Sequence, residues 1–157
     1  MGIIDNKKVS RNLLIIILML YFFVYFGRYS YNVSIVNMIS DGILTKTQSG
    51  TLTSVFYIIF FIGCFFSAFL SNKKYTYLLL FITGLGTAFA NLGFYFSKSF
   101  GLLLVFYTAN AVCQSLMFTP IFTIINTNIQ KRHRQIGVKY FSLLYPLSRL
   151  LDNIMVI

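Results

Sequence analysis

A single arginine, Arg28, lies inside the first long apolar stretch of the chain, residues 13–39. Residues 13–27 carry no charge, and the apolar character resumes beyond Arg28. Because a guanidinium keeps its charge in proteins, placing one at bilayer depth costs at least about 2.5 kcal/mol on insertion scales. Two arrangements would offset that cost. Either Arg28 faces a bundle interior or water-filled cavity, where a partner or ligand neutralises it, or the span ends at Gly27 and Arg28 reaches the headgroups.

Four side chains that can form hydrogen bonds share a helical face with this arginine, because residues three and four apart lie side by side on a helix. They are Tyr21, Tyr25, Tyr31 and Asn32. A polar stripe around a fixed cation suits a cavity that receives an anion, and the planar fork of arginine matches phosphate or carboxylate. Hydrogen bonding between helices for structure alone is the open alternative. The candidate substrate-binding residues of this stretch are Arg28, Tyr25, Tyr31 and Asn32.

A second polar position lies in the apolar stretch of residues 101–126. Asn110, Gln114 and Met117 fall on one helical face there. Six residues after Gln114 comes Pro120, which removes a backbone donor and is expected to kink the helix. Because kinked helices line the midplane sites of transporters, Gln114 is a further candidate for substrate contact. An amide inside a span also serves to hold helices together, and that interpretation stays open.

The composition predicts an all-α, polytopic membrane protein. Hydrophobic residues make up 57% of the chain and charged residues 10%, with the apolar ones in long blocks. A net charge of +10 is also found in nucleic-acid-binding proteins, but here the basic residues form short clusters between apolar blocks, so no nucleic acid is expected as a partner. Cys64 and Cys113 fall inside predicted spans without metal-ligand spacing, so no metal or other cofactor is expected. One histidine and three acids provide no catalytic constellation, so we do not expect an enzyme.

The apolar blocks predict four spans and part of a fifth, after a cytoplasmic leader at residues 1–11. A transmembrane domain would cover residues 12–157, with spans at residues 12–37, 51–71, 75–96 and 101–126 and the partial fifth at 136–157. Eight lysines and arginines lie in the leader, the 72–74 turn and the 131–134 loop, so the positive-inside rule predicts a cytoplasmic N-terminus. The members of the two basic loops are Lys73, Lys74, Lys131, Arg132 and Arg134.

Small residues inside two of the spans predict close contacts between helices. Gly63 and Ser67 have the small-xxx-small spacing that lets two membrane helices approach each other. Gly84 and Gly86 in the third span are interpreted in the same way.

The stretch around Arg28 is similar to a known family. Its pattern consists of an aromatic-rich helix and a loop with the order G-x-(S/T)-(K/R)-x-x-x-G. The matching residues here are Tyr25, Arg28, Tyr31, Gly42, Thr45, Lys46 and Gly50, with one residue more between the first glycine and the threonine. This order resembles the first helix and following loop of the major facilitator superfamily, and more narrowly its organophosphate:phosphate antiporter branch, which includes glycerol-3-phosphate and hexose-phosphate transporters. The spacing of Gln114 and Pro120 and the basic 131–134 loop agree with it, so the resemblance covers residues 21–149. One departure is the loop at residues 68–74, which lacks the usual glycine and aspartate.

The resemblance implies four to five helices of a six-helix N-terminal half, in a multi-pass protein of the bacterial inner membrane surrounded by lipid. It implies a secondary transporter that moves a small organic anion by alternating access, with Arg28 in the half-site. A C-terminal half, from the same or a separate gene, would complete the cavity, so the chain is expected to be a fragment that is inactive alone.

Two other classes compete with the transporter fragment. One is a small, non-transporting helical bundle that serves as a subunit or assembly partner, in which Arg28 pairs with an acid of another protein. The other is a small four-span exporter that acts as a homodimer. That group depends on an intramembrane glutamate, and the chain contains no glutamate.

Overall fold

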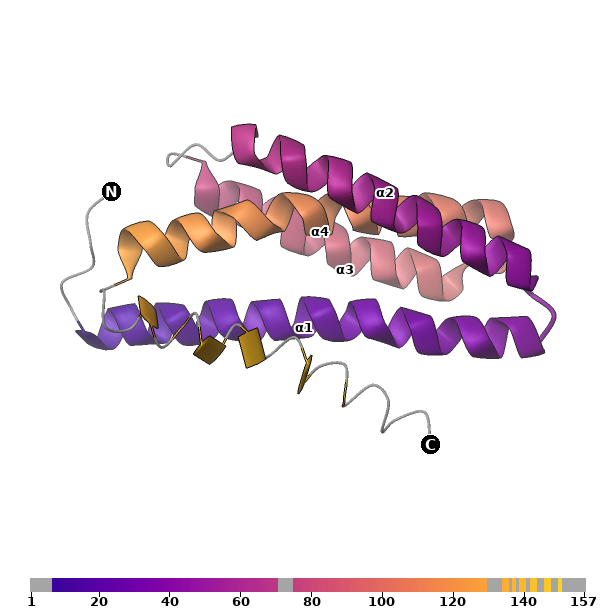
Figure 1. Ribbon diagram of the computed structural model, residues 1–157, viewed down its shortest axis with the longest axis horizontal. Coiled ribbons are helices and arrows are strands. Elements are labelled where there is room, and N and C mark those ends of the chain that lie inside the picture. The colour runs from indigo at the N-terminus through magenta and orange to yellow at the C-terminus, as the bar shows by residue number, and fades with distance from the viewer. Residues whose placement is uncertain are drawn as a thin grey trace. The chain divides into compact units, whose positions relative to one another are not determined.

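The computed structural model describes residues 7–70 and 75–129, together with separate positions from 134 to 150. Its elements are the helices α1 (Lys7–Ser40), α2 (Lys46–Leu70), α3 (Thr76–Phe96) and α4 (Phe100–Asn128) (Figure 1). Each contains a stretch long and apolar enough to cross a bilayer. Every element in the described part of the chain is helical, so the predicted all-α class is confirmed.

The helices differ from the predicted spans mainly at their N-terminal ends. α1 begins at Lys7 and α2 at Lys46, where spans from residues 12 and 51 were predicted. Both helices begin with polar residues that precede the apolar segment. The hydrogen bonds of a helix can continue outside the bilayer, whereas hydropathy marks only the part that lies within it. Of the predicted fifth segment, the described positions between 134 and 150 are helical. Lys73, Lys74, Lys131 and Arg132 lie outside the described residues, and the orientation in the membrane stays a prediction.

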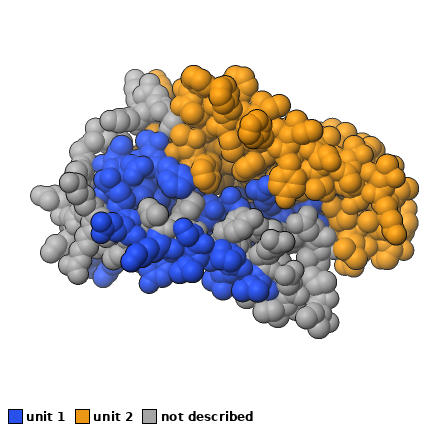
Figure 2. Space-filling model, in the orientation of Figure 1, with its two compact units in different colours: residues 1–31, 121–157 blue, residues 32–120 orange. Residues whose placement is uncertain are grey.

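The chain divides into two compact units. Unit 1 contains residues 1–31 and 121–157, and unit 2 contains residues 32–120 (Figure 2). The divisions fall within helices, so α1 and α4 each contribute to both units. In α4 the division follows directly after Pro120.

The core of unit 1 is formed by aliphatic side chains of α1 and of the last turns of α4. Its members include Leu14, Ile17, Ile121, Ile124, Ile125 and Ile129, none of them more than 5% exposed. Gly137, from the segment after α4, packs directly on α1: a Cβ placed there would lie 2.7 Å from Leu14 Cδ1. A larger residue at position 137 would therefore require the end of the Leu14 side chain to move.

α1 ends in a tight turn at Gly42. The residue has a φ of +72°, a left-handed conformation that glycine adopts without the penalty of a Cβ. The N–H of Ile43 donates to Met38 O at 2.9 Å, and the N–H of Gly42 donates to Ile39 O at 3.2 Å. These two bonds form a Schellman motif, which satisfies carbonyls at the helix end. The first glycine of the loop pattern therefore has a structural role.

α2 begins with a capping box. The N–H of Gln48 donates to Thr45 Oγ1 at 3.2 Å, and the N–H of Thr45 donates to Gln48 Oε1 at 3.0 Å. Each side chain thus satisfies a backbone donor that the first turn of the helix leaves open. The threonine of the loop pattern is therefore the N-cap of α2.

Replacing Thr45 by alanine should lower the free energy of unfolding by about 1 kcal/mol, since the N-cap acceptor is lost. Thermal or denaturant unfolding in detergent micelles, followed by circular dichroism, measures the change. Thr45→Ser keeps the hydroxyl and should have little effect. Equal losses in both variants would show that the hydroxyl does not stabilise α2.

Within unit 2, α2 and α4 run in the same direction and touch through small residues. A Cβ placed on Gly63 would lie 2.7 Å from Ser115 Cβ, closer than carbon atoms can approach. One turn further along both helices, Ser67 Oγ donates to Thr119 Oγ1 at 2.8 Å. The close packing predicted at Gly63 and Ser67 is confirmed.

α3 packs on α4 in the opposite direction. A Cβ on Gly86 would collide with the Cys113 side chain, and a Cβ on Gly93 would lie 2.6 Å from Phe106 Cζ. The prediction of close packing is therefore confirmed at Gly86. It is wrong at Gly84, where no described atom lies within 4 Å of the Cβ position. Two glycines only two residues apart face different sides of the helix, and a side chain of α4 lies close only to Gly86.

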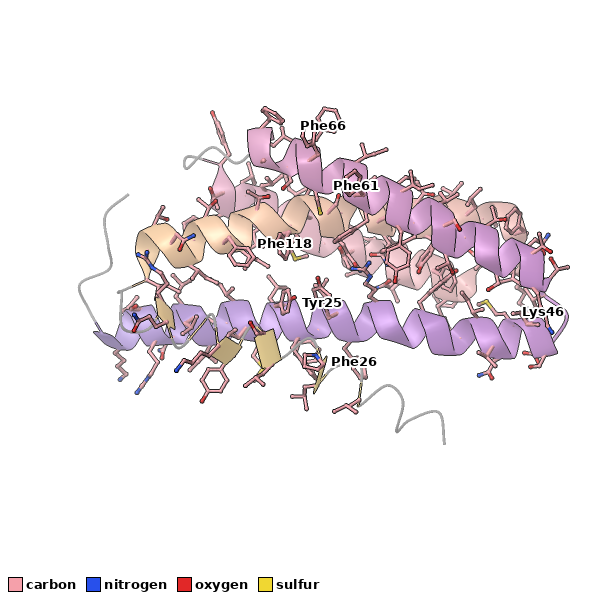
Figure 3. All side chains as sticks on the ribbon, viewed as in Figure 1. Tyr25, Phe26, Lys46, Phe61, Phe66 and Phe118 are labelled. Atoms are coloured by element: carbon pink, nitrogen blue, oxygen red, sulfur yellow. The ribbon has the colours of Figure 1, made fainter. Side chains whose placement is uncertain are left out.

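Large aromatic side chains cover the outer face of α2. Phe61 is 77% exposed and Phe69 is 76% exposed, and Phe65 and Phe66 are exposed beside them (Figure 3). In water an apolar patch of this kind promotes aggregation. In a bilayer it is an ordinary outer surface, because lipid tails solvate apolar side chains. The exposed phenylalanines therefore agree with helices that span a membrane.

Candidate functional site

Arg28 lies in an unbroken part of α1. The helix has 34 residues and is about 51 Å long, against about 30 Å for the hydrocarbon core of a bilayer. The apolar stretch of α1 that is long enough to cross this core runs from Lys8 to Arg28, so Arg28 lies at its C-terminal end. The side chain is half-buried. The helix continues for three turns beyond it, to Ser40.

A tyrosine ring adjoins the guanidinium on the same face of α1. The Cζ atom of Arg28 lies 5.8 Å from the centroid of the Tyr25 ring, within the range of a cation–π contact. The Tyr25 ring in turn lies 4.4 Å from the buried ring of Tyr21. Figure 3 shows Tyr25 and Phe26 leaving the helix on opposite sides. The structure therefore brings Tyr21, Tyr25 and Arg28 together in one stripe of unit 1.

The other two residues predicted on this face have different outcomes. Tyr31 is 5% exposed and is the last residue of the N-terminal part of unit 1. The backbone of Asn32 is helical, but its side chain lies outside the described residues. A role in substrate binding for either residue stays a prediction.

Gln114 is part of a buried chain of amides in unit 2. Its Nε2 donates to Asn110 Oδ1 at 3.1 Å, and Asn110 Nδ2 donates to Asn91 Oδ1 at 2.7 Å. Gln114 is 5% exposed and Asn110 is 3% exposed. The bond between Asn110 and Asn91 joins α4 to α3, which is the packing role that a polar residue in a span most often has. Contact between Gln114 and a substrate stays a prediction.

The sequence reasoning missed Asn91. It is the one asparagine or glutamine among residues 75–96, so a search for isolated amides in apolar spans would have found it. Its partner on α4 depends on the register between two helices, which the sequence does not show.

Pro120 lies inside α4, and the helix continues past it to Asn128. Because proline has no N–H, the carbonyl of Leu116, four residues earlier, loses its intrahelical donor. The single hydroxyl proton of Ser67 on α2 is shared between Thr119 Oγ1 at 2.8 Å and this carbonyl oxygen at 3.3 Å. A neighbouring helix therefore supplies the missing hydrogen bond, as membrane helices with proline require. The predicted kink itself stays a prediction.

Arg134 has a partner at the end of α4. Its Nη2 donates to the carbonyl oxygen of Asn126 at 2.7 Å. A cation in this position stabilises the carbonyls at a helix C-terminus and the negative end of its dipole. Arg134 was predicted as a member of a cytoplasmic basic loop, and in the structure it also serves as a cap for α4.

The described residues contain no group of three or more histidines, cysteines, aspartates or glutamates that could hold a metal ion. Cys64 and Cys113 are both free thiols. Two groups of candidate site residues remain. Arg28 lies beside tyrosines in unit 1, and a chain of neutral amides lies in unit 2.

Comparison with known proteins identifies the family. The sequence matches the family model described as Major Facilitator Superfamily over residues 17–151. The chain is similar to the membrane sensor protein UhpC of Escherichia coli (strain K12), with 29% identity over 104 residues. It is 31% identical over 104 residues to the protein of the same name from Salmonella typhimurium (strain LT2).

Each of these alignments covers 66% of this chain and 24% of the relative. The chain thus spans about a quarter of the length of the curated relatives it matches. No solved structure matches it. The family match covers most of the chain, and the four apolar helices agree with it. The chain therefore belongs to the Major Facilitator Superfamily, as the resemblance predicted, and is a multi-pass integral membrane protein.

Proposed function

We propose that the chain forms the N-terminal part of a secondary transporter that moves a small organic anion, such as a phosphorylated compound, by alternating access. The observation that carries this proposal is Arg28, half-buried inside α1 with the Tyr25 ring 5.8 Å from its Cζ atom. No other charge occurs between Arg11 and Asp41. One charged residue in an otherwise apolar helix suits a position at a water-filled cavity that receives an anion.

The side chains around Arg28 favour an anion with several oxygen atoms. A guanidinium can donate two parallel hydrogen bonds to phosphate or carboxylate, whereas an ammonium acts as a point charge. Tyr25, beside the guanidinium, and Tyr21, beside Tyr25, add hydroxyl groups to the same face of the helix. The likeness to the organophosphate:phosphate antiporter branch, in which the same loop pattern follows an arginine, supports this ligand class.

The remainder of the cavity would come from further helices. The curated relatives are about four times as long as the region that matches this chain. In transporters of this fold the substrate lies between two halves that rock around it. We therefore propose that a C-terminal half, on the same polypeptide or a separate one, supplies the opposite wall.

Binding of radiolabelled inorganic phosphate tests the proposal. The sample is vesicles that hold this chain together with any C-terminal half encoded beside it. Arg28→Ala should weaken binding at least tenfold, about 1.4 kcal/mol, because both charge and fork are lost. Arg28→Lys should recover only part of the affinity, since it keeps the charge alone.

Arg11→Ala is the matched control, because it removes an exposed arginine from the same helix. It should leave phosphate binding unchanged. Phosphate affinity that survives Arg28→Ala, or that falls equally in Arg11→Ala, would contradict an anion site at Arg28.

A membrane sensor is the second candidate function, because both curated relatives are named membrane sensor proteins. A sensor would bind the anion without moving it. The same vesicles separate the two functions. A transporter accumulates radiolabelled phosphate or exchanges it across the bilayer, whereas a sensor binds phosphate with no uptake above that of empty vesicles.

A further inference from the structure

One buried hydroxyl in the α3–α4 interface differs from four other threonine hydroxyls of the helices. Thr51, Thr53, Thr83 and Thr127 each donate to the carbonyl four residues earlier on their own helix. Thr87 is 3% exposed, yet its Oγ1 has no hydrogen-bond partner among the residues that the structure describes. Its hydroxyl therefore does not donate to the carbonyl of Thr83, four residues earlier, as the other four donate to theirs.

The surroundings of Thr87 are polar. Asn91 lies one turn further along α3 and accepts a hydrogen bond from Asn110 of α4. Because α3 and α4 run in opposite directions, the residue one turn beyond Asn110, which is Gln114, lies at the level of Thr87. Gln114 is joined to Asn110 by its own hydrogen bond. This register places Thr87 opposite Gln114, the last residue of the amide chain.

An open position lies one turn from Thr87 on α3. Gly84 lies three residues before Thr87 on a neighbouring position of the same helix, and helical side chains lean toward the preceding turn. No described atom lies within 4 Å of the position that a Gly84 Cβ would occupy. The position beside Gly84 is therefore open, one turn from Thr87 on the same helix.

We propose that a water molecule is bound between α3 and α4, where it accepts from or donates to Thr87 Oγ1 and joins it to the amide chain at Gln114. A buried hydroxyl without a partner is strongly unfavourable, above all in a bilayer, where no solvent is at hand to replace the partner. Buried waters occupy sites that are roomy and offer two to four polar partners. The hydroxyl of Thr87 and the amides of Gln114 and Asn110 provide that number.

The charge of the interface favours water over an ion. α3 and α4 contain no aspartate or glutamate. A sodium ion at this depth would lose its hydration without a carboxylate to offset its charge. Neutral hydroxyl and amide groups, which both donate and accept, match a neutral molecule that does the same.

Replacing Thr87 by valine should lower the unfolding midpoint if the hydroxyl binds a water, and should not lower it if the hydroxyl has no partner. Thermal unfolding of the full chain in lipid nanodiscs, followed by circular dichroism, is the measurement. Thr87→Val removes one anchor of the water, and we expect the midpoint to fall by about 3 °C, with Thr87→Ser close to wild type. A midpoint that rises or stays unchanged in Thr87→Val would mean that the hydroxyl has no bound partner, and it would overturn the proposal.

Thr83→Val is the matched control, because Thr83 is also 3% exposed but donates to Leu79 O of its own helix. It should shift the midpoint by less than about 1 °C. An equal fall in Thr83→Val and Thr87→Val would assign the effect to packing and contradict a bound water.

A second measurement needs no variant. In proton-detected solid-state NMR of the wild-type chain in bilayers, magnetisation transferred from water should reach the buried side-chain amide of Asn110. Absence of this transfer would overturn the proposal. Wild-type midpoints should also be equal in sodium chloride and choline chloride, and a rise specific to sodium would assign the site to the ion instead.

Discussion

Replacing Gly63 by alanine should lower the free energy of unfolding by about 1–3 kcal/mol, although alanine is the better helix former. The added methyl would lie 2.7 Å from Ser115 Cβ. A Cβ cannot rotate away as the end of a long side chain can, so α2 and α4 must separate. Separation would also weaken the neighbouring bond from Ser67 Oγ to Thr119 Oγ1, which is 2.8 Å long.

Gly50→Ala provides a matched control on the same helix, because nothing lies within 4 Å of a Cβ at that position. Here only helix propensity changes, and the variant should gain about 0.5–1 kcal/mol. Unfolding in detergent micelles by heat or denaturant compares the two. If both glycines respond with the same sign, the close contact between α2 and α4 does not limit the residue at position 63.

The sequence was sufficient to predict the helices of this protein. Long apolar blocks separated by short polar turns allow few structures other than membrane helices. Helix ends were less certain, because hydropathy marks where apolar residues stop and not where hydrogen bonding stops. The C-terminal end of α1 depends on Gly42, and the N-terminal end of α2 depends on Thr45. From the sequence, these two residues were identified only as parts of a family pattern. Their positive φ and capping box provide the physical reason for those residue types.

The candidate site was predicted only where its residues lie on one helix. The spacing of Tyr25 and Arg28 is enough to place them side by side, and the structure confirms the contact. Contacts between residues on different helices depend on the register and relative direction of the two helices. A single sequence does not show either. For that reason Asn91 was missed as the partner of Asn110, and Gly84 was wrongly expected to pack as Gly86 does.

The amide chain bears on the two interpretations of Gln114, which are contact with a substrate and packing between helices. Its Nε2 is used in a bond to Asn110, and that bond belongs to a link between α3 and α4. A side chain held in this way has a fixed orientation, which suits packing and also suits a binding group that needs little reorganisation. Substitution of Gln114 will therefore affect helix packing as well as any ligand, and Arg28 is the cleaner residue with which to test the anion site.

Substitutions at Ser67 and Pro120 should be strongly coupled. In the wild type, Ser67→Ala leaves the Leu116 carbonyl without its 3.3 Å donor and should destabilise by about 1–3 kcal/mol. In a Pro120→Ala background, residue 120 has an N–H that can bond to Leu116 O within the helix. The same Ser67→Ala substitution should then cost about 1 kcal/mol less, because only the contact with Thr119 is lost.

A double-mutant cycle measures this coupling from the four unfolding free energies. Ser115→Ala is the control: Ser115 is also fully buried between the helices, but it donates to Val112 O, which keeps its own helical donor. Its effect should be the same with proline or alanine at position 120. A cost of Ser67→Ala that is independent of position 120 would show that Leu116 O finds another partner. Coupling at Ser67 and none at Ser115 would instead establish that α2 supplies the bond that Pro120 removes. The substitution would then act at the point where α4 passes from unit 2 to unit 1.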